Sequence, residues 1–221
     1  LEQFQPQRFD PAKAAELGVP QDRFVVGYLG TLGMAHNLEN VLAAAARLEA
    51  QRVCFLLMGP GAERDALSGK IRARGLRNVI LAPPQPKAEM PRAWSLCDVA
   101  LVHLKDDPVF AGVIPSKIFE AMAMGLPVLL AAPAGEASGL IERESCGIHV
   151  PPDDPASLAA ATRQLAESPW LVERLAQKSL AAAPRYGRQR QARDMMAALE
   201  RAILPRQKGR HASAAALEER S

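Results

Sequence analysis

The sequence of 221 residues is 48% hydrophobic and 23% charged, a balance close to that of average globular proteins, which disfavours a disordered chain or a coiled coil. Its 27 Lys and Arg residues against 24 Asp and Glu give a net charge of +3, too small for a protein whose main partner is nucleic acid. No apolar run reaches the roughly 18 residues that span a bilayer, so the sequence predicts a soluble protein.

The cysteines and the N-terminus indicate where the protein resides. Cys54, Cys97 and Cys146 are odd in number and lie far apart in apolar runs, which argues against a disulfide framework and against a zinc site built on cysteines. The chain begins at Leu1 with no signal segment. We therefore expect a reducing cytoplasm, and we expect the N-terminal edge to be a cut through a longer protein.

The N-terminal part of the sequence alternates between strand and helix patterns. Residues 1–22 carry three prolines and predict a linker with a short helix at 11–17. The apolar run Phe24 to Gly30 has the length of a strand buried on both faces. From Leu38 the apolar residues fall on one face of a helix, for which Asn37 is the predicted N-cap.

The same alternation continues to the end of the chain. Further strands are predicted at 53–58, 79–82, 98–104, 128–132 and 147–150, and further helices at 63–74, 90–97, 116–124, 155–166, 170–183 and 188–204. The segment between the last two strands is predicted to be a loop. Strands that alternate with helices predict an α/β fold with a doubly wound, mostly parallel, Rossmann-like sheet. We expect one domain at 23–204 and a frayed basic tail at 205–221.

Ligands of such sheets bind at the carboxyl ends of the strands, which directs attention to the glycine turns there. Gly30 and Gly33 follow the first strand, but their spacing is not that of a dinucleotide fingerprint. Gly59 follows the second strand, in a turn where Pro60 removes one amide donor. Both turns are candidates for binding a phosphate, and a purely structural role for the glycines remains the alternative.

A third turn, before the helix predicted at 116–124, carries charge. Ser116 is the predicted N-cap, and the free amides of the first turn would attract a phosphate to which Lys117 adds a cation. Glu120 lies on the same helix face and can accept two hydrogen bonds from a ribose diol. The alternative interpretation is an exposed ion pair between Lys117 and Glu120.

Three further polar residues lie near the predicted strand ends. His36 directly follows the glycine loop and is either a phosphate ligand or a plain loop residue. His103 lies inside a strand and is expected to be a satisfied core histidine. Glu136 is assigned to a loop, where it either borders the ligand or is solvated.

The segment Pro115 to Val128 resembles the nucleotide-sugar-binding helix of glycosyltransferase family 4 (group 1), whose pattern runs E-x7-E-A-M-A-x-G-x-P-V. Segments 24–33, 53–61, 98–104 and 147–155 agree with the flanking motifs of that family in order and spacing. The resemblance extends to about Ile203. It implies the C-terminal, donor-binding half of the two-domain GT-B fold, and the run 108–120 is most similar to bacterial surface-polysaccharide transferases of the fucosamine-transferase type.

The resemblance also implies an activity for the whole protein. Members transfer a sugar from a nucleotide diphosphate sugar, here expected to be UDP-linked, to a glycan or lipid-linked acceptor of lipopolysaccharide or another surface polysaccharide. The transfer retains the anomeric configuration and requires no metal or other cofactor. The expected partners are the donor, the N-terminal domain that this chain lacks and, through the full-length enzyme, the inner face of the cytoplasmic membrane. The isolated chain is expected to be inactive.

The family pattern assigns roles to particular residues. Gly30 and Gly33 would face the diphosphate and Glu120 would bind the ribose. We expect the base near Pro83 to Gln85 and Met90, with Pro84 and Gln85 as contacts that it reaches mainly through backbone groups. Two departures from the pattern affect the remaining subsites. Gly112 replaces the glutamate that contacts the transferred sugar, and the apolar loop of Val109, Phe110 and Val113 is consistent with a deoxy or acetamido sugar. Val113 and Ile114 are also expected to line the donor site. The basic pair after the first strand appears as Thr31 and His36, which suits a subgroup in which Ser116 and Lys117 hold the phosphates.

Two alternatives stay open from the sequence. The first is one half of a nucleotide-sugar epimerase of related architecture, and the second is a stand-alone nucleotide-binding or partner subunit without catalysis. The arginines at the start of the helix predicted at 188–204 face the missing half, an anionic membrane or solvent.

Overall fold

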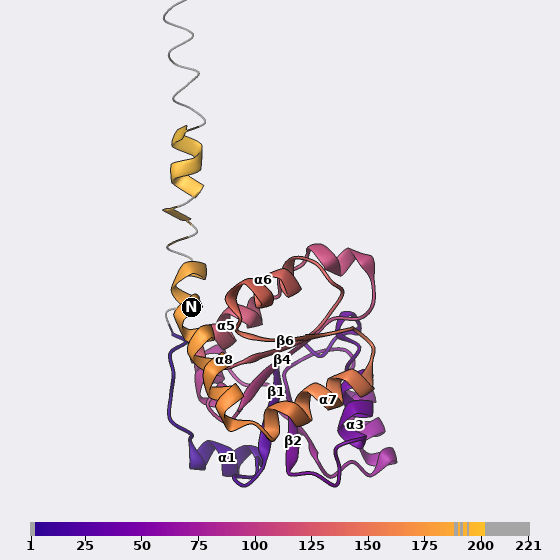
Figure 1. Cartoon of the computed structure of the whole chain (residues 1–221). Coiled ribbons are helices and arrows are strands. Elements are labelled where there is room, and N and C mark those ends of the chain that lie inside the picture. Colours follow the sequence, from indigo (N-terminus) through magenta and orange to yellow (C-terminus); the bar gives the residue numbers. More distant parts are fainter. Residues whose placement is uncertain (1–2, 188–189, 191, 194, 202–221) are drawn as a thin grey trace, which may run out of the picture. The chain divides into compact units, whose positions relative to one another are not determined.

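The computed structural model describes residues 3–187, 190, 192–193 and 195–201 (Figure 1). The chain divides into two units, Leu1–Ala183 and Pro184–Ser221. In the second unit the described residues from 190 to 201 are helical, within the helix that the sequence predicts at 188–204. The predicted tail at 205–221 lies outside the described residues.

The first unit is built on one parallel sheet of six strands in the order β3-β2-β1-β4-β5-β6, as the alternation of strands and helices predicts. The four inner strands β2, β1, β4 and β5 are mostly or wholly buried, which explains their nearly continuous apolar sequences. The order reverses direction between β1 and β4, where a doubly wound sheet opens its ligand crevice. The strands are β1 (Phe24–Leu29), β2 (Val53–Met58), β3 (Val79–Ala82), β4 (Val99–His103), β5 (Val128–Ala131) and β6 (Gly147–Val150).

Helices cover both faces of the sheet (Figure 1). On one face α2 packs against α3 and α7, and on the other α4 packs against α5, which also contacts α8. Three helices end at a glycine C-cap, since Gly18, Gly75 and Gly125 adopt the left-handed conformation after α1, α3 and α5. The α-helices are α1 (Pro11–Leu17), α2 (Leu38–Ala46), α3 (Arg64–Arg74), α4 (Met90–Trp94), α5 (Ser116–Met124), α6 (Glu136–Glu144), α7 (Pro155–Ala166) and α8 (Pro169–Ala182).

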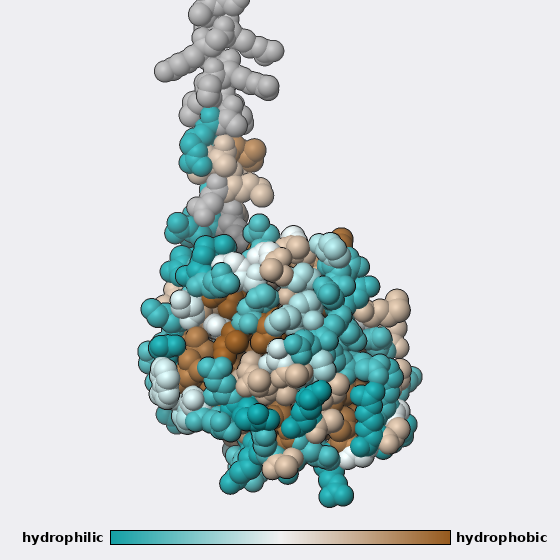
Figure 2. Space-filling view, turned by 45° about the vertical axis from the view of Figure 1, so that its right-hand side comes forward, coloured by the Kyte–Doolittle hydropathy of each residue, from teal (hydrophilic) through white to brown (hydrophobic). Residues whose placement is uncertain are grey.

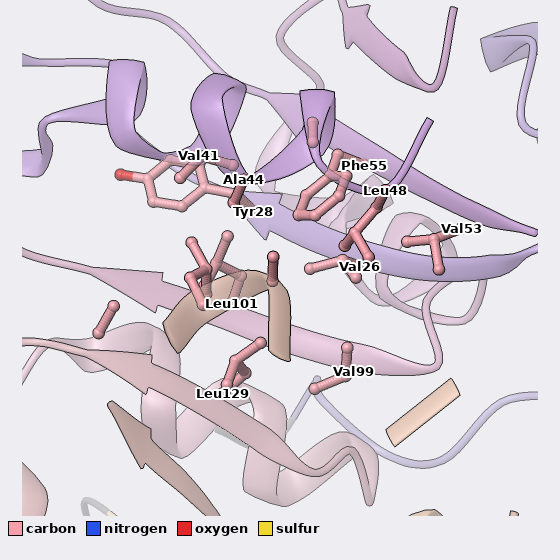
Figure 3. Close-up of a cluster of buried hydrophobic side chains, with 14 of the residues drawn as sticks. Val26, Tyr28, Val41, Ala44, Leu48, Val53, Phe55, Val99, Leu101 and Leu129 are labelled. Atoms are coloured by element: carbon pink, nitrogen blue, oxygen red, sulfur yellow. The ribbon is translucent and has the colours of Figure 1, made fainter. Parts of the chain in front are cut away.

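The hydrophobic core on the α2 face contains the side chain that matters most for the site. Figure 3 shows Val41 and Ala44 of α2, with Leu48 just after the helix, near Tyr28 of β1 and Phe55 of β2. Tyr28 is fully buried and its hydroxyl donates to the Thr31 carbonyl at 2.8 Å. The ring is therefore fixed at the carboxyl end of β1, where the glycine loop begins. Hydrophilic side chains cover most of the surface visible in Figure 2, and no helix among the described residues is long and apolar enough to cross a bilayer.

The prediction of a loop between β5 and β6 is wrong, because residues Glu136–Glu144 form helix α6. Glu136 is its first residue rather than a loop residue. Ala137, Leu140 and Ile141 are buried, and their spacing is that of one helix face. Gly139 in the middle of the segment lowers its helix propensity by about 1 kcal/mol, and the glycine obscured this pattern.

Of the two predicted N-caps, the one at Ser116 is wrong and the one at Asn37 is confirmed by position. Pro115, not Ser116, occupies the N-cap position of α5, so Ser116 is the first helical residue. Asn37 does cap α2 by position, with a φ of 35°, but its side chain makes no capping hydrogen bond. The Asn37 amide instead donates to the Asp153 carboxylate at 2.6 Å. The second oxygen of Asp153 accepts from the Asp106 amide at 2.9 Å, so Asp153 ties together two loops at the carboxyl edge of the sheet.

Candidate functional site

The glycine turns after β1 and β2 pack directly on one another. Gly30 and Gly59 have φ values of 146° and 149°, a region that side chains rarely adopt. A Cβ atom on Gly59 would lie 1.9 Å from the Gly30 carbonyl oxygen, so no other residue fits there. Gly59 therefore has a structural reason to be glycine, as the alternative interpretation of this turn holds. Gly33 has an ordinary φ of −126° and begins the short 3-10 helix Met34–His36.

Lys117 extends from the first turn of α5 to the glycine loop. Its Nζ atom lies 3.7 Å from the centroid of the Tyr28 ring, a cation–π contact. A Cβ atom on Gly30 would lie 3.1 Å from the same Nζ, so a larger residue at position 30 would crowd the ammonium. The exposed ion pair between Lys117 and Glu120 is not formed, since the Nζ atom is buried and has no hydrogen-bond partner.

The electrostatic state of Lys117 follows from this position. Burial lowers its pKa to about 7, and the negative charge of Glu120 opposes the shift. A buried ammonium that donates no hydrogen bond is costly, and an anion is the group that would offset the cost. Lys117 is thus poised to bind a negatively charged group at the carboxyl edge of the sheet.

The N-terminus of α5 adds backbone donors beside this ammonium. Extended Pro115 precedes the helix, so the amides of Ser116 and Lys117 have no acceptor within it. The Ile118 amide already donates to the Pro115 carbonyl at 3.1 Å. The first-turn amides and the positive end of the helix dipole attract an anion, as the Lys117 charge does.

His36 lies beside the same group. Its ring meets the Tyr28 ring edge-on, with centroids 5.8 Å apart. Its Nδ1 atom is 3.0 Å from the His103 carbonyl oxygen, and because a carbonyl only accepts, Nδ1 carries the proton in the neutral ring. Burial and the nearby Lys117 charge lower the His36 pKa. The donor that a neutral His36 would offer to a phosphate is therefore already engaged, and only the protonated ring has a second N–H to give.

Glu120 is half-buried one turn further along α5. Burial raises the pKa of its carboxyl group, and the indole N–H of Trp94 and the charges of Lys117 and Lys87 oppose the shift. The Trp94 Nε1 atom is buried and lies outside hydrogen-bond geometry with any acceptor, so its effect on Glu120 is that of a nearby dipole. An ionised carboxylate held this way can accept hydrogen bonds from two neighbouring hydroxyl groups.

The loop that enters α5 presents apolar side chains. Val109 and Val113 are 67% and 39% exposed, and Ile114 is half-buried. A Cβ atom on Gly112 would meet no atom within 4 Å, so position 112 has room for a side chain. Gly112 ends the 3-10 helix Pro108–Gly112, which places the whole loop at the carboxyl end of β4.

Pro84 and Gln85 belong to the loop after β3, at the same edge of the sheet. Pro84 is exposed and Gln85 is half-buried. The side-chain oxygen of Gln85 accepts from the Lys13 ammonium at 2.9 Å. Lys87 of the same loop acts on the Glu120 carboxyl, so this loop and α5 approach each other.

The model of the family described as "Glycosyl transferases group 1" matches residues 9–182. The chain belongs to this family. WcaI of Escherichia coli, whose name places it in colanic acid biosynthesis as a glycosyl transferase, is 31% identical over 67% of the chain. The match covers 37% of WcaI, so the chain spans less than half the length of this relative.

Solved glycosyltransferase structures share the fold of this group 1 domain. Sucrose-phosphate synthase from Thermosynechococcus elongatus superposes with a TM-score of 0.74 at 23% identity, over 92% of the chain and 50% of the synthase. HepE of Anabaena, solved in complex with UDP and glucose, superposes with a TM-score of 0.69 at 26% identity, over 82% of the chain and 49% of HepE. The Rossmann-like sheet therefore matches GT-B glycosyltransferases.

Other candidate features of the group 1 domain lie outside this cluster. His103 is buried, as predicted for a core histidine, and burial lowers its pKa to about 4. Its Nε2 atom is 2.7 Å from the Asn40 amide nitrogen, but its Nδ1 atom is buried without a hydrogen-bond partner, so the ring is only half satisfied. Among the described residues, no group of three or more His, Cys, Asp or Glu could hold a metal ion. A cavity of about 490 Å³ lies at the opposite edge of the sheet, beside Phe24, Asp98 and Gly125. No basic side chain of the described residues lines this cavity.

Tyr28 is the site residue that sequence reasoning missed. The sequence places it only within a buried strand, and the signal that points to the site is its position as the penultimate strand residue before the glycine loop. Glu63 was also missed, although it begins the turn into α3 and its charge acts on both Tyr28 and His36. The structure brings Gly30, His36 and Lys117 together around Tyr28.

Proposed function

We propose that the chain is the donor-binding half of a retaining glycosyltransferase that takes a sugar from a UDP-linked donor. The observation that carries this proposal is the buried Lys117 ammonium, which has no hydrogen-bond partner and lies against Gly30 at the N-terminus of α5. A diphosphate supplies the two negative charges and the acceptor oxygens that this position lacks.

The other parts of the donor follow from the diphosphate. We place the ribose at Glu120, whose carboxylate accepts from the two hydroxyl groups, and the base at the loop of Pro84 and Gln85. The transferred sugar then lies against Gly112, Val113 and Ile114. This loop offers mostly apolar contacts, which favours a deoxy or acetamido sugar over a plain hexose whose hydroxyls require partners.

The chemistry of this half is stabilisation of the leaving group. During transfer, the bond between the sugar C1 and the terminal phosphate oxygen of UDP breaks, and the acceptor hydroxyl oxygen bonds to C1 and loses its proton. Charge develops on the departing diphosphate, where Lys117 and the first amides of α5 stabilise it. Because the positive groups are part of the protein, this stabilisation requires no metal ion.

The remaining parts of the proposal concern the full-length protein. HepE was solved in complex with UDP and glucose, which supports a UDP-linked donor for the present protein. The name of WcaI refers to colanic acid biosynthesis, which supports a surface-polysaccharide acceptor. An N-terminal domain would bring the acceptor, and a lipid-linked acceptor would place the enzyme at the cytoplasmic face of the membrane. The isolated chain would then bind donor without transferring sugar.

Calorimetric titration with UDP tests the proposal. We expect binding that Lys117→Met weakens about tenfold or more, the effect of losing one charge-assisted contact, and that Glu120→Gln weakens less. Lys70→Met is the matched control, because Lys70 pairs with Glu39 between α2 and α3 and should leave the affinity unchanged. Absence of binding at millimolar UDP, or equal losses in Lys117→Met and Lys70→Met, would overturn the donor site.

The choice of sugar needs a second measurement. Saturation-transfer signals for UDP-glucose and for a UDP-linked N-acetylated deoxy sugar should differ in favour of the deoxy sugar. Gly112→Glu should reverse the preference, because position 112 has room for the side chain. A wild-type preference for plain glucose would remove the sugar assignment while leaving the diphosphate site intact.

A further inference from the structure

Lys13 is a buried charge that joins the N-terminal segment to the loop after β3. Its side chain is 3% exposed, although it belongs to the short helix α1, which precedes the sheet in sequence. The Nζ atom donates to Glu16 at 2.9 Å and to the side-chain oxygen of Gln85 at 2.9 Å, and it lies 3.5 Å from the Glu89 carboxylate. One ammonium thus holds together segments that are more than 70 residues apart.

Further contacts fix the same two segments to each other. The Arg92 guanidinium lies 2.8 Å from Asp10 and 2.9 Å from Glu89. The Gln3 side-chain amide donates to the Lys87 carbonyl at 3.3 Å. The N-terminal segment is therefore a strap over the loop of residues 83–89. Within this strap Lys13 is the most deeply buried polar group, so its contacts are the most costly to break.

The sequence of the loop explains why the orientation of Gln85 matters for ligand binding. In the run Pro83-Pro84-Gln85-Pro86, three residues lack a backbone N–H group, so Gln85 has the single amide donor. The Gln85 side-chain oxygen must be the atom that faces Lys13, because an ammonium only donates. With its side chain anchored in this way, Gln85 has little freedom to rotate its backbone N–H and C=O groups.

We propose that Lys13 is a positioning residue for recognition of the donor base. Acting through Gln85, it holds the single backbone donor of the proline run in the orientation in which a base edge can accept from it. The inference rests on the proposed function, in which the base lies at Pro84 and Gln85. It adds that the strap preceding the sheet determines how much the base contributes to donor affinity, while Lys117 determines the contribution of the diphosphate.

Comparison of UDP with inorganic pyrophosphate separates these two contributions. The dissociation constant of each ligand is measured by calorimetry for the wild-type chain, for Lys13→Met, for Gln85→Leu and for the double variant. We expect Lys13→Met to weaken UDP binding about tenfold and to leave pyrophosphate within about twofold. Gln85→Leu should do the same, and the double variant should lose no more than either single one, because both act through one contact.

Several outcomes would overturn the inference. If Lys13→Met weakens the binding of UDP and pyrophosphate by the same factor, Lys13 is a purely structural residue. If it changes neither dissociation constant, Lys13 has no role in base binding. Lys70→Met controls for loss of a paired lysine. If Lys13→Met does not fold, Gln85→Leu decides the question, because it leaves Lys13 paired with Glu16 and Glu89. Failure of Lys117→Met to weaken pyrophosphate would instead contradict the proposed function.

Discussion

At the scale of single residues, the charge of Lys117 links donor binding to pH. The pKa of Lys117 is about 7 because its ammonium is buried, and a bound diphosphate raises that pKa again. Above pH 7 the free protein must therefore take up a proton when the donor binds. We predict that the affinity for UDP-glucose falls by up to about tenfold per pH unit from pH 7 to 9, measured by calorimetry.

Two features of this pH experiment make it specific. The phosphates of UDP-glucose do not titrate above pH 7, and the pKa of the neighbouring His36 is lowered from 6.5, so neither accounts for a change in this range. Lys117→Arg keeps its charge at every pH tested and should give a flat profile. A wild-type profile as flat as that of Lys117→Arg would show that Lys117 does not titrate on binding.

The same burial makes Lys117 a cost to folding. The unfolded chain has a lysine pKa near 10.5, so between about pH 7 and 10 the unfolded state binds more protons and stability rises with pH. Lys117→Met removes this cost, which is largest at pH 7 and below. We predict a gain of about 1 kcal/mol, or ~2–4 °C in Tm, at pH 6.5 and a smaller gain at pH 10, measured by thermal denaturation. A lower Tm at both pH values would contradict the prediction.

Sequence reasoning could identify Lys117 and Glu120 but not their surroundings. The helix start, its charges and the glycine loop are local patterns, and each predicted an anion site at one edge of the sheet. The contact between Lys117 and the Tyr28 ring depends on the packing of α5 beside β1, which no local spacing encodes. For the same reason the sequence left the ion pair of Lys117 and Glu120 open as an alternative, and the buried ammonium removes it.

At the scale of elements, the N-terminus of α6 supports the loop that enters α5. A Cβ atom on Gly135 would lie 2.1 Å from the Ala111 carbonyl oxygen, so Gly135→Ala must displace the 3-10 helix Pro108–Gly112. We predict that the free energy of unfolding falls by about 1–3 kcal/mol. We also predict that the variant loses more affinity for UDP-sugars than for UDP. Gly112→Ala is the control, because its Cβ would meet no neighbour. Equal Tm values for the two variants would contradict the prediction.

The missed helix and the misplaced cap show where element prediction fails. Strands β1 to β6 were predictable because each is a short apolar run closed by a turn residue. Helix α6 was not recognised because Gly139 interrupts a short amphipathic pattern, although burial of Leu140 and Ile141 against the sheet stabilises it. Ser116 resembles an N-cap, but Pro115 already has the extended conformation that the cap position requires. Tertiary packing and the fixed geometry of proline decided these cases.

At the scale of the whole molecule, the two edges of the sheet are chemically different. The carboxyl edge gathers the Lys117 ammonium, the α5 amides and the glycine turns, whereas the cavity at the amino edge is lined largely by apolar side chains such as Phe24 and Met124. The strap that contains Lys13 lies within residues 1–22, which the sequence predicts to be a linker with a short helix. The strap therefore connects the segment before the sheet to the loop after β3.

The candidate donor site lies within the first of the two units of the chain. The unit Leu1–Ala183 contains the sheet, the core cluster and every candidate site residue, whereas Met195, Met196 and Leu199 of the second unit are exposed. A chain that ends at Gly187 should therefore unfold within about 2 °C of the full chain and bind UDP with an affinity within about twofold, because its core is unchanged. Thermal denaturation and calorimetry measure both. A large fall in Tm would show that the second unit stabilises the first, and a selective loss of UDP affinity would show that it contributes to the donor site.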